Sequence, residues 1–359
     1  PTTSSINLNQ AVVFSNGGPQ GAASIAALVN PLLTWETTTQ TDFGMDLGLF
    51  NNKLEVVFDY YWRYTNDILI SLPVPQTSGF SSIQENAAEV ENKGWDLGVN
   101  FNDRKGDFNY SLGFNLSDVR NKVLNLLETG PYISGFQIIQ EGEEMNSIFG
   151  FQSDGFFQNQ AEIDAHAKQF GVLRPGDIRY VDQNSDGVIN AEDRVIIGSR
   201  IPRWTYGANL NFGYKGLDLS VFLQGIGRYN GYQSSHAAWP FENSGSGKAQ
   251  IRHADTWSTD NPNARYPNWY IATNGNNYQR SSFWATDASY FKLKNFVLGY
   301  TFPQQFAGNK YFKKLRVYIS GQNVITLDKM EGFDPESPLG DANFYPQVSV
   351  YTFGVNANF

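Results

Sequence analysis

The sequence predicts an all-β, antiparallel fold, and two observations carry this prediction. Apolar and polar residues alternate over several stretches, of which "FNYSLGFNLSDV" at 108–119 is one example. In a strand, such alternation gives one apolar face and one polar face. The connections between the stretches are also unequal in length. Some are short turns, whereas 120–200 and 228–282 are long and rich in Gly, Asn, Ser and Trp.

Three hairpins account for much of the alternating pattern. They join 42–49 to 54–62, 95–102 to 108–117, and 204–214 to 217–223. The short turns between them read "NNK", "DRKGD" and "KG". A tight turn fixes the register of the strands it joins, so each pair predicts an antiparallel hairpin.

The remaining elements are fewer. Further strands are expected at 289–302, 313–326 and 347–359, which brings the total to roughly ten to twelve. A helical period is found only at 160–170. Short turns at one end of a sheet and long loops at the other are typical of a transmembrane β-barrel, and we expect 120–200 and 228–282 to be extracellular loops of such a barrel.

A soluble β-sandwich with decorated loops is the alternative fold, because its strands would show the same alternation. Charged residues make up 17% of the chain, against about 25% in an average soluble protein, and aromatic residues make up 15%. Trp204 and Tyr214 stand at the two ends of one apolar face, and Trp95 begins another. Aromatic residues at strand ends are typical of the interfacial girdles of membrane barrels, so the barrel is favoured.

Composition also excludes several classes of protein. The net charge of −9, with no Lys/Arg cluster, excludes nucleic acid as a partner. The chain has no cysteine, so disulfides, thiol metal sites and thiol nucleophiles are excluded. The longest apolar stretch, 22–35, is interrupted by Asn30 and Pro31 and is too short for a transmembrane helix. No signal peptide opens the chain, so it is mature, cytoplasmic, or a fragment.

The C-terminal stretch carries a local signal. Tyr351, Phe353, Val355 and Phe359 alternate with small or polar residues up to the last position. This pattern resembles the terminal-strand signal by which barrel-assembly machinery recognises outer-membrane proteins. The alternative is a core strand that happens to end the chain.

Several long phrases, in order, resemble one family. They include "NPLLTWETTTQTDFGMDLGLFNNKLEVVFDYYWRYTNDIL", "ENKGWDLGVNF", "PGDIRYVDQNSDGVINAEDRVIIGS", "RWTYGANLNFGYKGLDLSVFLQGIG", "YFKLKNFVLGYTFP" and "LRVYISGQNVITLDKMEGFDPE". Together they are similar to the C-terminal part of a SusC/RagA-type TonB-dependent outer-membrane transporter. The resemblance runs from about residue 30 to Phe359.

The resemblance implies an integral protein of a Bacteroidetes-type outer membrane that imports oligosaccharides or peptides. It implies a SusD-like surface lipoprotein as a lid, and energy delivered through TonB. Barrels of this kind have about 22 strands and a plugged lumen. A dozen strands cannot form such a barrel, so we expect 1–359 to be its C-terminal half, without the plug, the TonB-contacting segment or the early strands.

The segment "DQNSDGVINAED" at 182–193 has the spacing of a calcium loop. Oxygen ligands at alternate positions converge on one cation, and Gly187 permits the sharp turn between them. The expected ligands are Asp182, Asn184, Asp186, the carbonyl of Val188, Asn190 and Asp193. The alternative is a metal-free turn held by bonds from Asn and Asp side chains to the backbone. Calcium would stiffen the loop rather than act in catalysis.

Aromatic residues in the second long loop are candidates for contact with a substrate or with the lid. They are Trp239, Trp257, Trp269 and Tyr270, set among Asn and Gly residues. Aromatic faces beside amide groups suit sugar rings, peptide side chains and protein partners alike. Packing inside the loop is the third explanation.

No catalytic constellation is expected, so the chain is not predicted to be an enzyme. Glu242 and Asp260 could in principle form a glycosidase pair, and His253 lies near Asp255, but only proximity in sequence supports either pairing. His166, His236 and His253 lack the spacing of metal ligands. The rival function from another class is a secreted calcium-binding β-sandwich that recognises carbohydrate.

Overall fold

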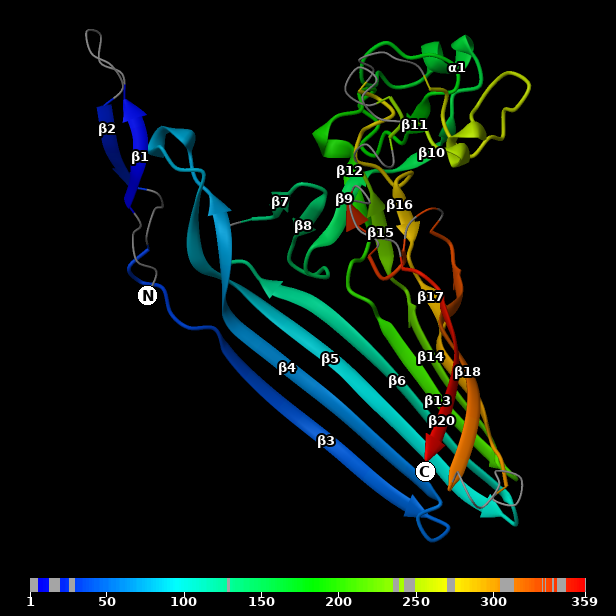
Figure 1. Ribbon diagram of the computed structural model, residues 1–359. Helices are drawn as coiled ribbons and strands as arrows, with labels where there is room; N and C mark the ends of the chain where they lie inside the picture. The colour runs from blue at the N-terminus through cyan, green and yellow to red at the C-terminus, as the bar shows by residue number, and fades with distance from the viewer. Residues whose placement is uncertain are drawn as a thin grey trace.

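The fold is dominated by one nine-stranded antiparallel sheet. The computed structural model describes residues 6–12, 20–25, 30–127, 130–234, 239–241, 249–269, 275–303, 313–330, 332, 334–337, 339–340 and 347–358. The strand order in the sheet is β20-β18-β17-β14-β13-β6-β5-β4-β3. Figure 1 shows these strands as a tilted, curved wall, with the long connections gathered at one end.

The nine strands of the sheet are β3 (Thr37–Leu49), β4 (Leu54–Pro73), β5 (Ser82–Lys105), β6 (Phe108–Asn125), β13 (Trp204–Tyr214), β14 (Leu217–Gly227), β17 (Tyr290–Thr301), β18 (Lys314–Asp328) and β20 (Val350–Asn358). The three predicted hairpins are confirmed, as are the strands expected near 289–302, 313–326 and 347–359. In the third hairpin Lys215 and Gly216 both have positive φ, which is the backbone of a two-residue turn matched to strand twist.

Two strands are longer than the sequence predicted. β4 extends to Pro73 instead of ending near 62, and β5 begins at Ser82 instead of near 95. In these extensions polar side chains such as Thr65 and Glu89 occupy both faces, so the apolar–polar alternation stops although pairing continues. Register shifts between Thr65 and Leu69 also interrupt the period of two, so alternation did not mark the extensions, although Ile70 and Val90 are buried there.

The long connections carry smaller elements of their own. These are β7 (Tyr132–Ser134), β8 (Gln137–Ile139), β9 (Ser147–Phe151), β10 (Ser153–Phe156), β11 (Ile178–Tyr180), β12 (Arg194–Gly198), β15 (Asn230–Gln233), β16 (Ala285–Asp287) and β19 (Leu339–Gly340). A separate pair, β1 (Ile6–Val12) and β2 (Gln20–Ile25), precedes the main sheet. The predicted helical period corresponds to α1 (Gln160–Ala165), which Asn159 caps by accepting from the Glu162 N–H. No helix in the described ranges is long and apolar enough to span a membrane.

One face of the main sheet is apolar across all nine strands. A single row of paired positions shows it: Leu49, Leu54, Phe101, Leu112, Leu210, Val221, Phe296, Gly321 and Tyr351. Many large side chains on this face stay exposed, including Phe43 at 69% and Phe353 at 71%. No second sheet therefore covers them in the described part of the chain, and the soluble sandwich is wrong.

Aromatic side chains border this apolar face at both ends. Trp95 and Trp204 meet edge to face with ring centroids 6.1 Å apart toward the long connections. Phe108 and Phe212 stack at 6.4 Å toward the short turns. Trp204 and Tyr214 are ten residues apart on β13, or about 33 Å of strand, which a tilt of about 40° reduces to about 25 Å. That height matches the apolar band of an outer-membrane barrel.

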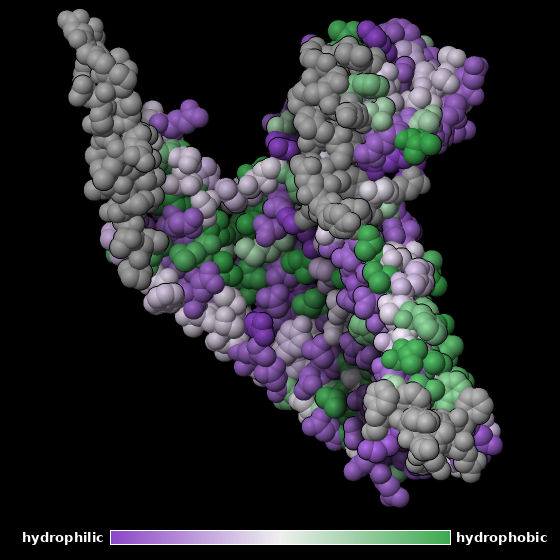
Figure 2. All heavy atoms as spheres, in the orientation of Figure 1, coloured by the Kyte–Doolittle hydropathy of each residue, from purple (hydrophilic) through white to green (hydrophobic). Residues whose placement is uncertain are grey.

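The opposite face is polar. A paired row on it reads Asn102, Ser111, Asn211, Ser220, Val297, Ser320 and Thr352. In Figure 2 hydrophilic residues gather in the hollowed lower part of the sheet, and hydrophobic ones lie along the flank of β17 and β18. The sheet thus separates an apolar surface from a wettable one.

Arginine substitutions test the two faces. Leu112→Arg places a charge in the middle of the apolar face and should cost about 2–4 kcal/mol, whereas Ser111→Arg on the polar face should cost much less. Denaturant unfolding of the complete protein, refolded in lipid, measures both variants. Equal losses at the two positions would contradict the assignment of faces.

Candidate functional site

The polar face of the sheet, called the polar wall below, carries side chains that lie across glycines of neighbouring strands. Arg316 on β18 crosses Gly299 on β17 and forms a bidentate ion pair with Asp218 on β14, at 3.0 Å and 2.5 Å. A Cβ at position 299 would approach the guanidinium to within 2.3 Å, so only glycine allows this crossing. Tyr61 lies over Gly94 in the same way. Polar side chains such as Arg316 thus find partners along the wall and do not project from it.

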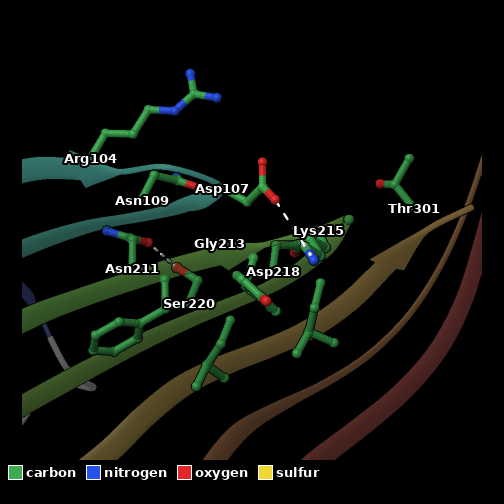
Figure 3. A pocket seen from close by; sticks show the side chains of 14 residues that line it. Arg104, Asp107, Asn109, Asn211, Gly213, Lys215, Asp218, Ser220 and Thr301 are labelled. Carbon is green, nitrogen blue, oxygen red and sulfur yellow. Dashed lines mark hydrogen bonds and ion pairs between the residues drawn. The ribbon is translucent and has the colours of Figure 1, made fainter. Parts of the chain in front are cut away.

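A pocket of about 570 Å³ opens on the polar wall near the short turns. Figure 3 shows Asn109, Asn211, Asp218 and Ser220 lining it from β6, β13 and β14. Ser220 Oγ donates to Asn211 Oδ1 at 2.5 Å. Arg104 and Lys215 balance the two acids of the lining, Asp107 and Asp218. The described lining is therefore a polar surface whose formal charges balance.

At the other end of the sheet, the described residues of the two long connections pack into one loop assembly (within 126–203 and 228–289). A buried polar network joins them. Asn277 Nδ2 donates to Asp177 Oδ1 at 2.8 Å, and Asn277 Oδ1 accepts from the Ile178 N–H at 2.9 Å. Asn276 Nδ2 donates to the Ile178 carbonyl at 2.8 Å. Buried amides that are fully paired across two segments fix how those segments meet.

Tyr180 belongs to the same network. Its side chain is fully buried, and its hydroxyl donates to the Asn276 carbonyl at 2.6 Å. Burial raises the pKa of Tyr180 far above its ordinary value, so the hydroxyl stays protonated and remains a donor. Sequence reasoning missed this network, since its partners lie about 100 residues apart and only "NN" at 276–277 marked them.

Aromatic side chains form the core of the loop assembly. Tyr232, Tyr266 and Trp284 are buried together, and Trp269 packs against them. Trp257 is 5% exposed, and its Nε1 donates to Gln158 Oε1 at 3.1 Å. Internal packing therefore accounts for Trp257, whose ring a ligand cannot reach in this conformation. Trp239 stacks on Tyr278 with centroids 5.6 Å apart, and Tyr270 lies outside the described residues.

The 182–193 loop is shaped by its own hydrogen bonds. Asp182 accepts from the N–H groups of Ser185 and Gly187, at 2.7 Å and 2.9 Å. The fully buried Asp193 accepts from the N–H groups of Gln183 and Asn190, both at 2.8 Å. These bonds suit the metal-free alternative, although each carboxylate keeps lone pairs that could also bind a cation.

The other expected calcium ligands of this loop contact groups within the loop itself. Asp186 Oδ1 accepts from the Val188 N–H at 2.8 Å, and Asn184 Oδ1 accepts from the Asp186 N–H at 3.0 Å. Asn190 Nδ2 lies 3.4 Å from the Val188 carbonyl. Across the described part of the chain, no group of three or more His, Cys, Asp or Glu side chains is placed to hold a metal. Calcium stays a prediction.

A second polar cluster ties the connection after β18 to the sheet. The ammonium of the buried Lys292 lies 2.9 Å from Asp334 and 2.9 Å from Glu336, and Lys294 lies 2.6 Å from Glu336. Burial raises the pKa of Glu336, but the hydrogen bonds and charges of the two lysines outweigh burial and hold that pKa below its usual range. Sequence reasoning missed this cluster as well.

The remaining predicted residues lie apart from these groups. Tyr351, Phe353 and Val355 project from the apolar face of β20, so the assembly signal stays a prediction, and Phe359 lies outside the described residues. His253 is buried beside Tyr266, with ring centroids 5.1 Å apart.

The residues considered for catalysis also lie apart from these groups, as far as the structure describes them. Asp255 accepts from Asn261 Nδ2 at 2.9 Å, which holds a turn of the chain. Glu242 and His236 lie outside the described residues, so the glycosidase pair cannot be placed.

Comparison with known proteins identifies relatives over nearly the whole chain. The "TonB dependent receptor-like, beta-barrel" family matches residues 2–324. TonB-dependent receptor P3 of Formosa agariphila is 32% identical over 356 residues, which cover 92% of this chain and 35% of the relative. TonB-dependent receptor SusC of Bacteroides thetaiotaomicron is 25% identical, over 98% of this chain and 35% of the relative.

Solved structures are similar to this chain as well. The RagAB peptide importer in its open-open state is 27% identical, with a TM-score of 0.76 over 99% of this chain and 38% of that one. The RagAB peptide transporter gives a TM-score of 0.79 at 25% identity, again over 99% of this chain and 38% of that one. The chain thus spans about 35% of the length of the curated relatives it matches.

The buried network of the loop assembly can be tested by one substitution. Asn277→Leu removes the hydrogen bonds of Asn277 to Asp177 Oδ1 and to the Ile178 N–H, which should cost about 1–3 kcal/mol. The cost should fall on the loop assembly, so limited proteolysis should cut residues 126–203 and 228–289 faster while the sheet stays folded. Gln183→Ala, which removes an exposed side-chain bond to Gln152, is the matched control. Unchanged cleavage of Asn277→Leu would contradict the role of the network.

Proposed function

This chain belongs to the TonB-dependent receptor β-barrel family, in its SusC/RagA-type branch in the bacterial outer membrane, and we propose that it forms part of a TonB-dependent importer. One observation carries the proposal: nine paired strands present a continuous apolar face between two aromatic borders and a polar face behind it. Such a sheet can hold water on one side while lipid covers the other. The smooth polar wall would line the path of the imported molecule.

The proposed cargo is an oligosaccharide or a peptide. The solved neighbours are named as a peptide importer and a peptide transporter, and one curated relative is SusC. A polar wall with balanced charges, as in the pocket of Figure 3, suits uncharged polar groups such as sugar hydroxyls or peptide amides. The energy would come through TonB, by way of parts of the receptor outside this chain.

We assign the loop assembly to the extracellular side. Short turns at one end and long connections at the other give the sheet the polarity of outer-membrane barrels, whose long loops face outward. A SusD-like lipoprotein would sit on these loops as a lid. Trp269 and Tyr270 stay candidates for contact with the lid or the substrate, as does Trp239.

Calcium in the 182–193 loop is a separate part of the proposal. Asp182, Asn184, Asp186, Asn190 and Asp193 would supply side-chain oxygens and Val188 its carbonyl. A bound ion would stiffen this part of the loop assembly.

Co-purification tests the import proposal. The complete receptor, extracted from outer membranes in mild detergent, should carry a surface lipoprotein that mass spectrometry identifies. Uptake of its cargo by cells should stop when the proton gradient is collapsed, because TonB delivers that energy. A receptor found in the soluble fraction would contradict the proposal, as would uptake that survives collapse of the gradient.

Calcium binding is tested by protection of the loop. Added Ca²⁺ should slow proteolysis within 182–193 in the wild-type receptor, and Asp182→Ala together with Asp186→Ala should abolish this protection, because both remove oxygen ligands. Mg²⁺ at the same concentration is the control ion, since its smaller octahedral shell fits such a loop poorly. Equal cleavage with and without Ca²⁺ would favour the metal-free turn.

A further inference from the structure

We propose that a pocket in the loop assembly binds a sugar unit that carries a negative charge. The pocket has a volume of about 450 Å³, within the range of small-molecule sites. Its walls include Phe151, Phe170, Trp239 and Tyr278, and its charged residues are Arg194 and Arg280. The inference rests on the proposed function and narrows its substrate class.

The ring faces that the pocket can offer to a ligand are those of Trp239 and Tyr278, which stack with an interplanar angle of 29°. Phe151 is buried and meets Phe170 at 5.2 Å, so this pair closes another part of the pocket. Flat ring faces beside polar groups are suited to stacking against the apolar face of a sugar ring.

The two arginines give the pocket a positive charge that is not neutralised. Arg194 Nε donates to the Ala191 carbonyl at 3.3 Å, and its guanidinium lies over Phe149 at 5.4 Å. Arg280 Nη1 donates to the Gly135 carbonyl. Both contacts leave guanidinium N–H groups to spare, and neither arginine pairs with an acid among the described residues. In the described part of its lining, the pocket has no Asp or Glu.

Guanidinium groups bind carboxylates and sulfates through paired hydrogen bonds. An oligosaccharide with uronate or sulfate groups therefore matches the pocket in charge and in ring faces. A neutral oligosaccharide would leave the two arginines desolvated without a partner, which costs affinity.

A peptide fits less well, because peptide recognition relies on main-chain hydrogen bonds. The backbone groups of Phe151 beside the pocket are already paired. The Phe151 N–H donates to the Arg280 carbonyl at 2.7 Å, and the Ser282 N–H donates to the Phe151 carbonyl at 2.8 Å. The pocket therefore offers a ligand side-chain groups and ring faces, and this combination suits sugars.

Calorimetric titration of the purified complete receptor tests the inference. The probes are trigalacturonate, its methyl ester, a sulfated trisaccharide and the peptide Glu-Glu-Glu. We expect trigalacturonate to bind at least about tenfold tighter than its ester, which removes only the charges, since a charged hydrogen bond is worth roughly that factor. Comparing trigalacturonate with the sulfated trisaccharide shows which acid the pocket prefers, and binding of either supports the inference.

Variants locate the site. Arg194→Gln should weaken the binding of the acidic sugar at least about tenfold, and Trp239→Leu should also weaken it. The matched control is Arg179→Gln, because Arg179 lies elsewhere in the loop assembly and pairs with Asp154 at 2.7 Å. The control variant should bind like the wild type.

Three results would overturn the inference: equal binding of the ester, full affinity in Arg194→Gln, or tighter binding of Glu-Glu-Glu than of either acidic sugar. The comparison of acid and ester uses only the wild-type receptor, so it decides even where a variant fails to fold. A receptor that carries its lipoprotein and imports cargo, yet binds none of the acidic sugars, would refute this inference and leave the proposed function intact.

Discussion

The structure depends on one constraint: every backbone N–H and C=O at membrane depth must find a partner within the sheet. Lipid supplies no hydrogen bonds, so the ladder has to continue from strand to strand without a break. The seven inner strands meet this demand on both sides with antiparallel pairing and few register shifts, and β3 and β20 each pair on one side within the described sheet. Since register fixes which side chains share a row, the same pairing also produces one apolar face and one polar face. Arg316, Gly299 and Asp218 show the consequence, because they can meet only if three strands hold the same register.

The sheet could be predicted from the sequence because the determinants of the sheet are local. A period of two and a tight turn such as Lys215-Gly216 specify a hairpin without any distant residue. The strand ends were missed at Pro73 and Ser82, because register shifts between Thr65 and Leu69 break the period of two. In these extensions Ile70 and Val90 are nevertheless buried in an apolar cluster. Apolar–polar periodicity therefore predicts the membrane-facing part of a strand but not the part beyond it.

The loop assembly could not be predicted in the same way. Its stability comes from pairs such as Asn277 with Asp177, which lie 100 residues apart, and no local pattern encodes them. Trp257 illustrates the difficulty, because an aromatic residue among Asn and Gly reads equally well as a ligand contact or as a core residue. Burial decides, and burial is set by the fold of both connections together. The calcium-like spacing was visible in sequence for the opposite reason, since the bonds that Asp182, Asp186 and Asp193 accept all lie within twelve residues.

The connection that follows β18 is also joined to the sheet by charge. Lys292 shares the face of Gln224 and of the polar wall, and it pairs with Asp334 and Glu336 of that connection. A buried ammonium is costly unless it is paired, so these two acids keep the connection against β17. Met330 of the same connection is buried in one cluster with Tyr232 and Trp284. The loop assembly therefore packs against a segment that these ion pairs hold to the sheet.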